Sequence, residues 1–151
     1  MAQYTGYRAS ITPATGVANG VLETVAGVEA RVKEFGWGGE STTSTAMNTI
    51  VARDSIVGTG SRTAGNVQRS NMHGVVHAAF FSTTYATLQP TILAGALYGT
   101  SWNSHGGVIR WLAAPGEEFQ IYDAGATTAS LEVRAVVGVG TSSYHLIWDE
   151  M

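Results

Sequence analysis

The sequence predicts an all-β protein: a single-domain antiparallel β-sandwich over residues 1–151, jelly-roll-like, with eight to ten strands and little helix. In the last third of the chain, apolar residues recur at every second position over residues 131–139 and 144–148. A period of two residues places one set of side chains on a buried face and the other on a wet face. Helix signals are nearly missing, because 19 glycines recur throughout and no window carries a capped apolar stripe of helical period.

The first half of the chain contains four predicted strands separated by turn residues. They are residues 4–11, 21–25, 28–37 and 46–53. In the third of these strands the alternation slips after Val32, because the next large apolar residues are Phe35 and Trp37. One extra residue in a strand produces such a slip, so we expect a β-bulge near residues 34–36.

The second half contains the remaining predicted strands. They are residues 92–98, 108–112, 119–122, 131–139 and 144–148. Pro115-Gly116 predicts a turn before the third-last strand, and the last strand is expected to be central and buried. Residues 73–88 leave two alternatives open, a short helix around residues 75–81 or a strand. Residues 55–71 are rich in Gly, Ser and Thr, so we expect a long exposed loop there.

Composition excludes several classes of protein. Charged residues make up 13% of the chain, against a typical ~25%, and the net charge of −3 leaves no basic footprint for nucleic acid. No run approaches the ~18 apolar residues of a membrane-spanning helix. Residues 1–4 lack the basic and apolar regions of a signal peptide. The absence of cysteine excludes disulfides and thiolate metal sites and fits synthesis in a reducing cytoplasm.

Two histidine-containing segments resemble reactive motifs without matching them. His73 and His77 have the i, i+4 spacing of a helical zinc pair, but His-Gly-Val-Val-His lacks the HExxH glutamate and favours no helix. Ser104-His105 could belong to a triad with a distant aspartate, but no Gly-x-Ser-x-Gly elbow is present. Neither segment predicts a catalytic or metal centre.

The remaining motifs also predict no chemistry. Glu117 and Glu118 are adjacent, so on a strand they point to opposite faces and cannot act together on one glycosidic bond. The glycines of residues 36–39 and 58–60 match neither a P-loop nor a dinucleotide-binding fingerprint. We therefore expect a non-enzymatic protein that uses neither a metal nor a cofactor.

Six residues are the predicted contacts with a partner. They are Tyr4, Tyr7, Arg62, Arg69, Trp102 and His105. We expect the segment of residues 1–12 to contact a partner. Residues 2–7 carry the two tyrosines and few charges, so we expect them to pair with a neighbouring subunit by strand addition. The two arginines lie in the predicted loop of residues 55–71. Trp102 and His105 lie in a polar loop, where we expect an exposed aromatic contact with a subunit or a glycan, whereas Trp111 and Trp148 are expected in the core.

Three segments together resemble a known group of proteins. They are Arg-Val-Lys-Glu-Phe-Gly-Trp-Gly-Gly-Glu-Ser-Thr-Thr-Ser-Thr at residues 31–45, Gly-Val-Ile-Arg-Trp-Leu-Ala-Ala-Pro-Gly-Glu-Glu-Phe at residues 107–119 and Tyr-His-Leu-Ile-Trp-Asp-Glu at residues 144–150. This ordering resembles small structural proteins of tailed bacteriophages, of the jelly-roll decoration or head-fibre type. The resemblance carries no catalytic residues.

The resemblance implies a virion protein made in the host cytoplasm. The first expectation is a homotrimeric capsid decoration (cement) protein that contacts the major capsid protein or other virion subunits and stabilises the phage head. The alternative is a tail or head-fibre module that binds host-surface glycan. A small lectin-like or enzymatic β-domain outside any virus is the third.

Overall fold

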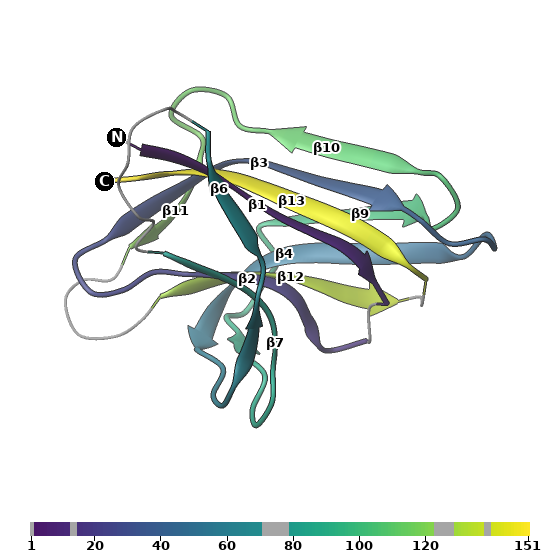
Figure 1. Ribbon diagram of the computed structural model, residues 1–151, viewed down its shortest axis with the longest axis horizontal. Coiled ribbons are helices and arrows are strands. Elements are labelled where there is room, and N and C mark those ends of the chain that lie inside the picture. Colours follow the sequence, from purple (N-terminus) through teal and green to yellow (C-terminus); the bar gives the residue numbers. More distant parts are fainter. Residues whose placement is uncertain (1, 13–14, 71–78, 123–128, 138–139) are drawn as a thin grey trace.

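The computed structural model describes residues 2–12, 15–70, 79–122, 129–137 and 140–151, and every regular element in these ranges is a β-strand (Figure 1). The strands form two antiparallel sheets that pack face to face. The predicted all-β sandwich is confirmed. Within residues 73–88 the strand alternative is found, as β7 (Phe80–Tyr85), whereas His73 and His77 lie outside the described residues.

The first sheet has six strands and contains both ends of the described chain. Its order is β10 (Val108–Leu112), β3 (Glu29–Gly39), β13 (Ser142–Glu150), β1 (Ala2–Ile11) and β6 (Asn66–Arg69), and β11 (Phe119–Tyr122) also pairs with β3. β13 lies between β3 and β1 and pairs with both along most of its length. The prediction that the last strand is central and buried is confirmed.

The second sheet has seven strands and packs beneath the first in the view of Figure 1. Its order is β5 (Arg62–Ala64), β7, β2 (Ala18–Glu23), β12 (Ser130–Val137), β4 (Ala46–Ile56) and β8 (Thr91–Ile92), and β9 (Tyr98–Asn103) also pairs with β4. The central strand β12 keeps its predicted alternation, with Leu131 and Val133 in the core.

The connectivity is that of a jelly roll. Without the short additional strands, the two sheets read β1-β13-β3-β10 and β2-β12-β4-β9. Successive strands cross from one sheet to the other, except that β4 and β9 are neighbours in the same sheet. This arrangement of interlocking Greek keys is the predicted topology.

The predicted bulge in β3 is present, one residue before the expected position. On β13, Ile147 pairs with Glu34 and Trp148 pairs with Val32, so Lys33 is the extra residue. The carbonyl of Lys33 accepts a hydrogen bond from the amide of Ala113 at 2.8 Å, where the β10 to β11 segment leaves the edge of β3. The bulge shifts the phase, so that Phe35 reaches the core while Glu34 turns to the outer face.

A tight turn joins β10 to β11 as predicted. The amide of Glu117 donates to the carbonyl of Ala114 at 2.9 Å, and Gly116 has φ of 88°. Proline at the second position and a left-handed glycine at the third define a type II turn. The turn returns the chain to the same edge of β3, so that both β10 and β11 border one strand.

The core is a continuous layer of aliphatic and aromatic side chains between the sheets. Trp111 stacks on Phe35 and on Phe119, with ring centroids 4.5 Å apart in each pair. Trp148 is fully buried at the centre of the first sheet, as predicted, whereas Trp111 is only partly buried because β10 lies at the edge. Aromatic pairs of this geometry add to the free energy of burial.

Two predictions about segments are wrong. The N-terminal segment has no free strand to add to a neighbour's sheet, because β1 already pairs with β13 on one side and β6 on the other. The long loop expected at residues 55–71 contains β5 and β6, which pair with β7 and β1. Composition concealed these strands, because each is short and lies at the edge of its sheet.

Candidate functional site

Tyr4 and Trp102 are buried in the monomer, so the prediction of exposed contacts at these positions is wrong. The Tyr4 ring stacks on Trp148 with centroids 5.9 Å apart. Trp102 is 9% exposed, and its indole N–H donates to Thr49 Oγ1 at 3.0 Å. Its polar neighbours suggested a loop, but β9 extends to Asn103 and strand alternation turns the indole inward.

The other four predicted contacts lie on separate elements. Tyr7 is exposed on the outer face of the first sheet, and Arg69 is partly buried on β6 of the same sheet. His105 is exposed in the turn after β9, where its Nδ1 lies 2.9 Å from the carbonyl oxygen of Ser41. The backbone of Arg62 belongs to β5, and its side chain lies outside the described residues. The structure does not bring these residues into one site.

A different set of side chains is assembled on the outer face of the first sheet. One cross-strand row runs from Arg110 on β10 through Gly36 on β3 and His145 on β13 to Tyr7 on β1. The row lies on the outer face because the residues on either side of Gly36 belong to the core. Four adjacent strands therefore place the guanidinium of Arg110, the imidazole of His145 and the phenol of Tyr7 in one row.

Glu34 holds two members of this row in place. Arg110 donates to both carboxylate oxygens, Nε to Oε1 at 2.6 Å and Nη2 to Oε2 at 2.8 Å. His145 Nε2 lies 2.9 Å from the same Oε1. The hydrogen bonds from Arg110 lower the pKa of Glu34, against the opposing effect of its burial, and those to Glu34 raise the pKa of Arg110. Bidentate pairing of this kind restricts both side chains.

Two glycines create the space for this arrangement. A Cβ atom at Gly36 would lie 2.3 Å from His145 Cε1, so only glycine lets the imidazole cross β3 to reach Glu34. A Cβ atom at Gly38 would meet only Ser143 Oγ, at 3.2 Å. The ring therefore occupies the space above Gly36, and the space above Gly38 stays open.

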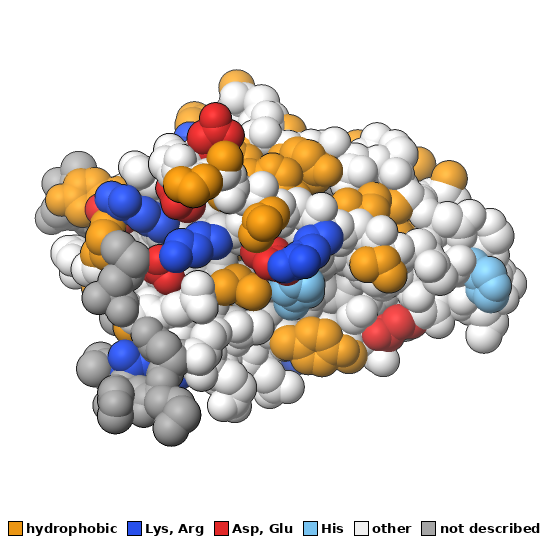
Figure 2. All heavy atoms as spheres, turned by 90° about the horizontal axis from the view of Figure 1, so that it is seen from above, with side chains coloured by type: hydrophobic (Ala, Val, Ile, Leu, Met, Phe, Trp, Pro, Cys, Tyr) orange, Lys and Arg blue, Asp and Glu red, His pale blue; other side chains and the backbone are white. Residues whose placement is uncertain are grey.

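The open space is a groove of about 250 Å³ on the outer face of the sheet. Its lining includes Tyr7 on one side, Val108 and Arg110 on the other, and Gly38 and Ser143 between them. Figure 2 looks onto this face and shows hydrophobic side chains interspersed with acidic, basic and histidine side chains. We call this feature the Tyr7 groove.

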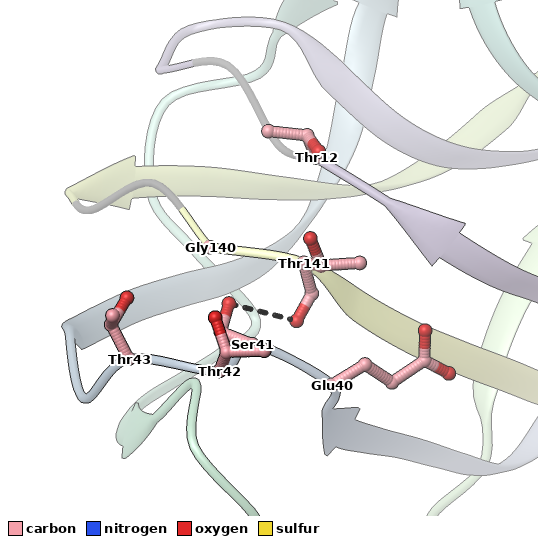
Figure 3. Close-up of a pocket in the computed structure, with 7 residues that line it drawn as sticks. All are labelled: Thr12, Glu40, Ser41, Thr42, Thr43, Gly140 and Thr141. Carbon is pink, nitrogen blue, oxygen red and sulfur yellow. Dashed lines mark hydrogen bonds between the residues drawn. The ribbon is translucent and has the colours of Figure 1, made fainter.

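A second hollow lies at the end of the sandwich, where three connections meet (Figure 3). It encloses about 310 Å³ and is lined by Thr12, Glu40, Ser41, Thr42, Thr43, Gly140 and Thr141. The Ser41 hydroxyl donates to the carbonyl of Thr141 at 3.4 Å. Glu40 Oε2 accepts from the amide and hydroxyl of Ser10, at 3.0 and 3.2 Å. The lining offers hydroxyl groups but no aromatic ring.

The outer face of the second sheet buries a carboxylate pair around one arginine. Glu132 on β12 is fully buried, and Arg134 Nε lies 2.6 Å from its Oε1. Arg134 Nη2 donates to the carbonyl of Pro90 at 2.7 Å, and Ser130 Oγ donates to Asp54 Oδ2 at 2.5 Å. Burial is the main cause that raises the pKa of Glu132 to about 7 and that of Asp54 to about 6.

Tyr85, the last residue of β7, and the residues after it contact the same face of the second sheet. The Tyr85 hydroxyl donates to Glu23 Oε2 at 2.7 Å, and Gln89 Nε2 donates back to the carbonyl of Tyr85 at 2.6 Å. Glu23 adds a further negative charge that raises the pKa of Asp54. The acidic groups are thus part of the packing between the second sheet and residues 85–90.

The chemistry available in the Tyr7 groove is recognition. Arg110, Ser143 and Tyr7 offer hydrogen-bond donors, and the tyrosine ring offers an apolar face. Within the described ranges, no hydrogen bond joins Ser143 to His145, whose Nε2 contacts Glu34. Within the same ranges, no group of three or more histidine or carboxylate residues is arranged to hold a metal ion.

A weak signal for this site was present in the sequence. Phe35 and Trp37 alternate with Gly36 and Gly38, which leaves one face of the strand bare of side chains. Glu34 precedes the two glycines on that same face. Its partners are 76 and 111 residues away in the chain, so only the strand order of the jelly roll shows that they meet.

Comparison with protein-family models, with curated proteins and with solved structures finds no match to this chain. In the part of the chain that the structure describes, no helix has the length and apolar character needed to cross a membrane.

Proposed function

We propose that this chain is a non-enzymatic virion structural protein, an oligomeric and most simply trimeric capsid decoration protein. The proposal joins the sequence resemblance described above to the jelly-roll sandwich. Its partners are other copies of the chain and the major capsid protein or other virion subunits. A protein with this role needs area and rigidity, and a packed two-sheet sandwich supplies both.

The observation that carries the proposal is the exposed apolar edge of the first sheet. Val108 is 80% exposed and Leu112 is 62% exposed, and both lie on β10. Tyr122 on β11 is also exposed, and β10 and β11 pair only with β3 among the described strands. Exposed apolar side chains along an unpaired strand edge mark a surface that another chain covers.

The edge carries few of the features that keep sheet edges from pairing. Neither β10 nor β11 contains proline or lysine, the residues that commonly block an edge. The charge of Arg110 is compensated by Glu34 on the neighbouring strand. A symmetric oligomer would repeat this edge around its axis, and a lattice would multiply weak contacts by avidity.

Assembly and capsid binding test the proposal. The double substitution Val108→Gln/Leu112→Gln removes the apolar edge, and Leu93→Gln changes an exposed leucine in the segment after β8 as a matched control. Light scattering gives the oligomeric state, and co-sedimentation with capsids that lack the chain gives the number of bound copies. We expect a trimer and many copies per capsid for the wild type and for Leu93→Gln, and a loss of both for the double variant.

A monomeric wild type that stays in the supernatant would overturn the proposal. The glycan-binding alternative loses its predicted contact at Trp102, because that indole is buried and hydrogen-bonded in the monomer. No residue of the loop after β9 replaces it as an aromatic platform, since residues 103–107 contain no tryptophan, tyrosine or phenylalanine.

A further inference from the structure

We propose that the Tyr7 groove binds one neutral pyranose ring of a saccharide, stacked against Tyr7 and hydrogen-bonded by Arg110 and Ser143. This site is distinct from the exposed edge that carries the proposed assembly, although Val108 borders both. The inference goes beyond the proposed structural role, because it assigns a small ligand to the outer face of the first sheet.

The shape of the groove fits one sugar ring. Its volume of about 250 Å³ lies just below the ~300–1,000 Å³ of pockets for drug-sized ligands. Gly38 has no side chain, and a Cβ atom there would approach only Ser143 Oγ. The floor is therefore open backbone, over which a flat ring can lie close to the sheet.

One wall of the groove is aromatic and accessible. Tyr7 is 45% exposed and lies directly across from His145 in the cross-strand row. A phenol ring offers an apolar face for the C–H groups of a pyranose and a hydroxyl for its polar edge. The Tyr7 ring does not belong to the described hydrophobic core, in contrast to the buried ring of Tyr4.

The polar groups of the groove are held in position before any ligand binds. The carboxylate of Glu34 fixes Arg110 by accepting two hydrogen bonds from its guanidinium, and it contacts the Nε2 atom of His145. Groups that are fixed in advance lose less conformational entropy on binding, which is how few contacts give measurable affinity.

The charge balance selects a neutral ligand. The carboxylate of Glu34 lies within salt-bridge distance of the one fixed positive charge in the groove, that of Arg110. A phosphate or a sugar acid would have to compete with this buried partner for the guanidinium. A saccharide hydroxyl needs only a free N–H or O–H donor, which Arg110, Ser143 and Tyr7 supply.

A titration of the full-length chain with four methyl glycosides tests the site. The probes are the methyl pyranosides of glucose, galactose, mannose and N-acetylglucosamine, followed by amide chemical shifts. We expect saturable shifts at Gly36, Gly38 and Ser143 with at least one probe. Tyr7→Ala should weaken that binding by at least about tenfold, whereas Leu93→Ala, which removes an exposed side chain outside the groove, should leave it unchanged.

A second variant separates binding from folding. Gly38→Val fills the open floor where only Ser143 Oγ is near, so we expect a folded protein that no longer binds the probe. Absence of saturable shifts with all four glycosides, or binding that survives both Tyr7→Ala and Gly38→Val, would overturn the proposal. Stronger shifts with inorganic phosphate would overturn the assignment of a neutral ligand. Val108 and Arg110 of β10 line the groove and also belong to the edge of the sheet. Tyr7→Ala and Gly38→Val leave Val108 and Leu112 unchanged, so we expect capsid binding in the assembly assay to persist in both variants.

Discussion

Tyr4 stacks on Trp148 at a centroid separation of 5.9 Å, and the two residues are directly paired across β1 and β13. The contact joins the first described strand to the last at the centre of one sheet. Both rings belong to the buried core. β1 is therefore part of the framework of the sheet, and because both of its edges are paired it offers a partner its outer face instead of a free strand edge.

Deletion of residues 2–10 should unfold the protein. The deletion removes β1 from between β13 and β6 and exposes Trp148. Large-to-small substitutions of a buried tryptophan cost about 3–5 kcal/mol of unfolding free energy, and we expect at least a loss of this size. Near-UV circular dichroism and urea denaturation give the measurement. A truncated chain that retains a cooperative transition would show that β1 is an accessory strand.

Gly36→Ala should destabilise the protein more than Gly38→Ala. The new methyl group at position 36 meets the His145 ring at 2.3 Å, whereas at position 38 it meets one rotatable hydroxyl at 3.2 Å. Overpacking of this kind costs about 1–3 kcal/mol, and we expect a loss in that range for Gly36→Ala alone. Urea midpoints of the two variants make the comparison. Equal losses would mean that the imidazole moves aside without cost.

Stability should fall as the pH rises from 5 to 8. Burial raises the pKa of Glu132 to about 7 and that of Asp54 to about 6, above the ordinary carboxyl values near ~4. Groups with a raised folded-state pKa contribute stability that is complete below ~4. The contribution is lost between ~4 and about 6 for Asp54 and between ~4 and about 7 for Glu132, with a slope on the order of 1 kcal/mol per pH unit for each group.

Glu132→Gln tests this assignment. The variant should show a flatter dependence of unfolding free energy on pH between 5 and 8, because it removes one of the two groups whose pKa is raised. Glu117→Gln, which changes an exposed glutamate in the β10 to β11 turn, is the control and should keep the wild-type slope. Identical slopes in all three proteins would place the titration elsewhere.

The ion pair on the first sheet should show the opposite dependence. Hydrogen bonds from Arg110 lower the pKa of Glu34, so this contribution is present above the ordinary value of ~4.3 and is lost as the pH falls through the folded-state pKa. Arg110→Gln should therefore be less stable than the wild type at pH 7, and the difference should shrink towards pH 3. Thermal unfolding at both values measures it, and a difference that does not change with pH would exclude the ion pair as its cause.

Local alternation was sufficient to predict the long strands. β12 and β13 carry a clean two-residue period. In β3 the slip after Val32 predicted a bulge near residues 34–36, one residue from the bulge observed at Lys33. Trp102 was misplaced because its neighbours in sequence are polar, although the indole itself is buried against Thr49. Short strands such as β5 were missed because three residues carry no readable period.

The candidate site was beyond sequence reasoning for a different reason. In the sequence, each of the residues Glu34, Arg110 and His145 has the pattern of an ordinary polar strand residue. Nothing in the neighbouring sequence indicates that the three meet. They become neighbours because β3 lies between β10 and β13, an order set by the jelly-roll connections. The local sign of the site is the pair of glycines in β3. They leave one face of the strand without side chains, and His145 occupies part of that space.

The pairing of β1 with β13 also decides how the molecule responds to force. Ala2 lies opposite Glu150, so the two strands leave the same end of the sandwich side by side (Figure 1). Tension applied through these two points separates an antiparallel ladder one hydrogen-bonded pair at a time, like a zipper, instead of shearing the whole ladder at once. The protein therefore resists little force that is applied at these two residues. Any mechanical load that it carries in an assembly has to be applied through the sides of the sandwich.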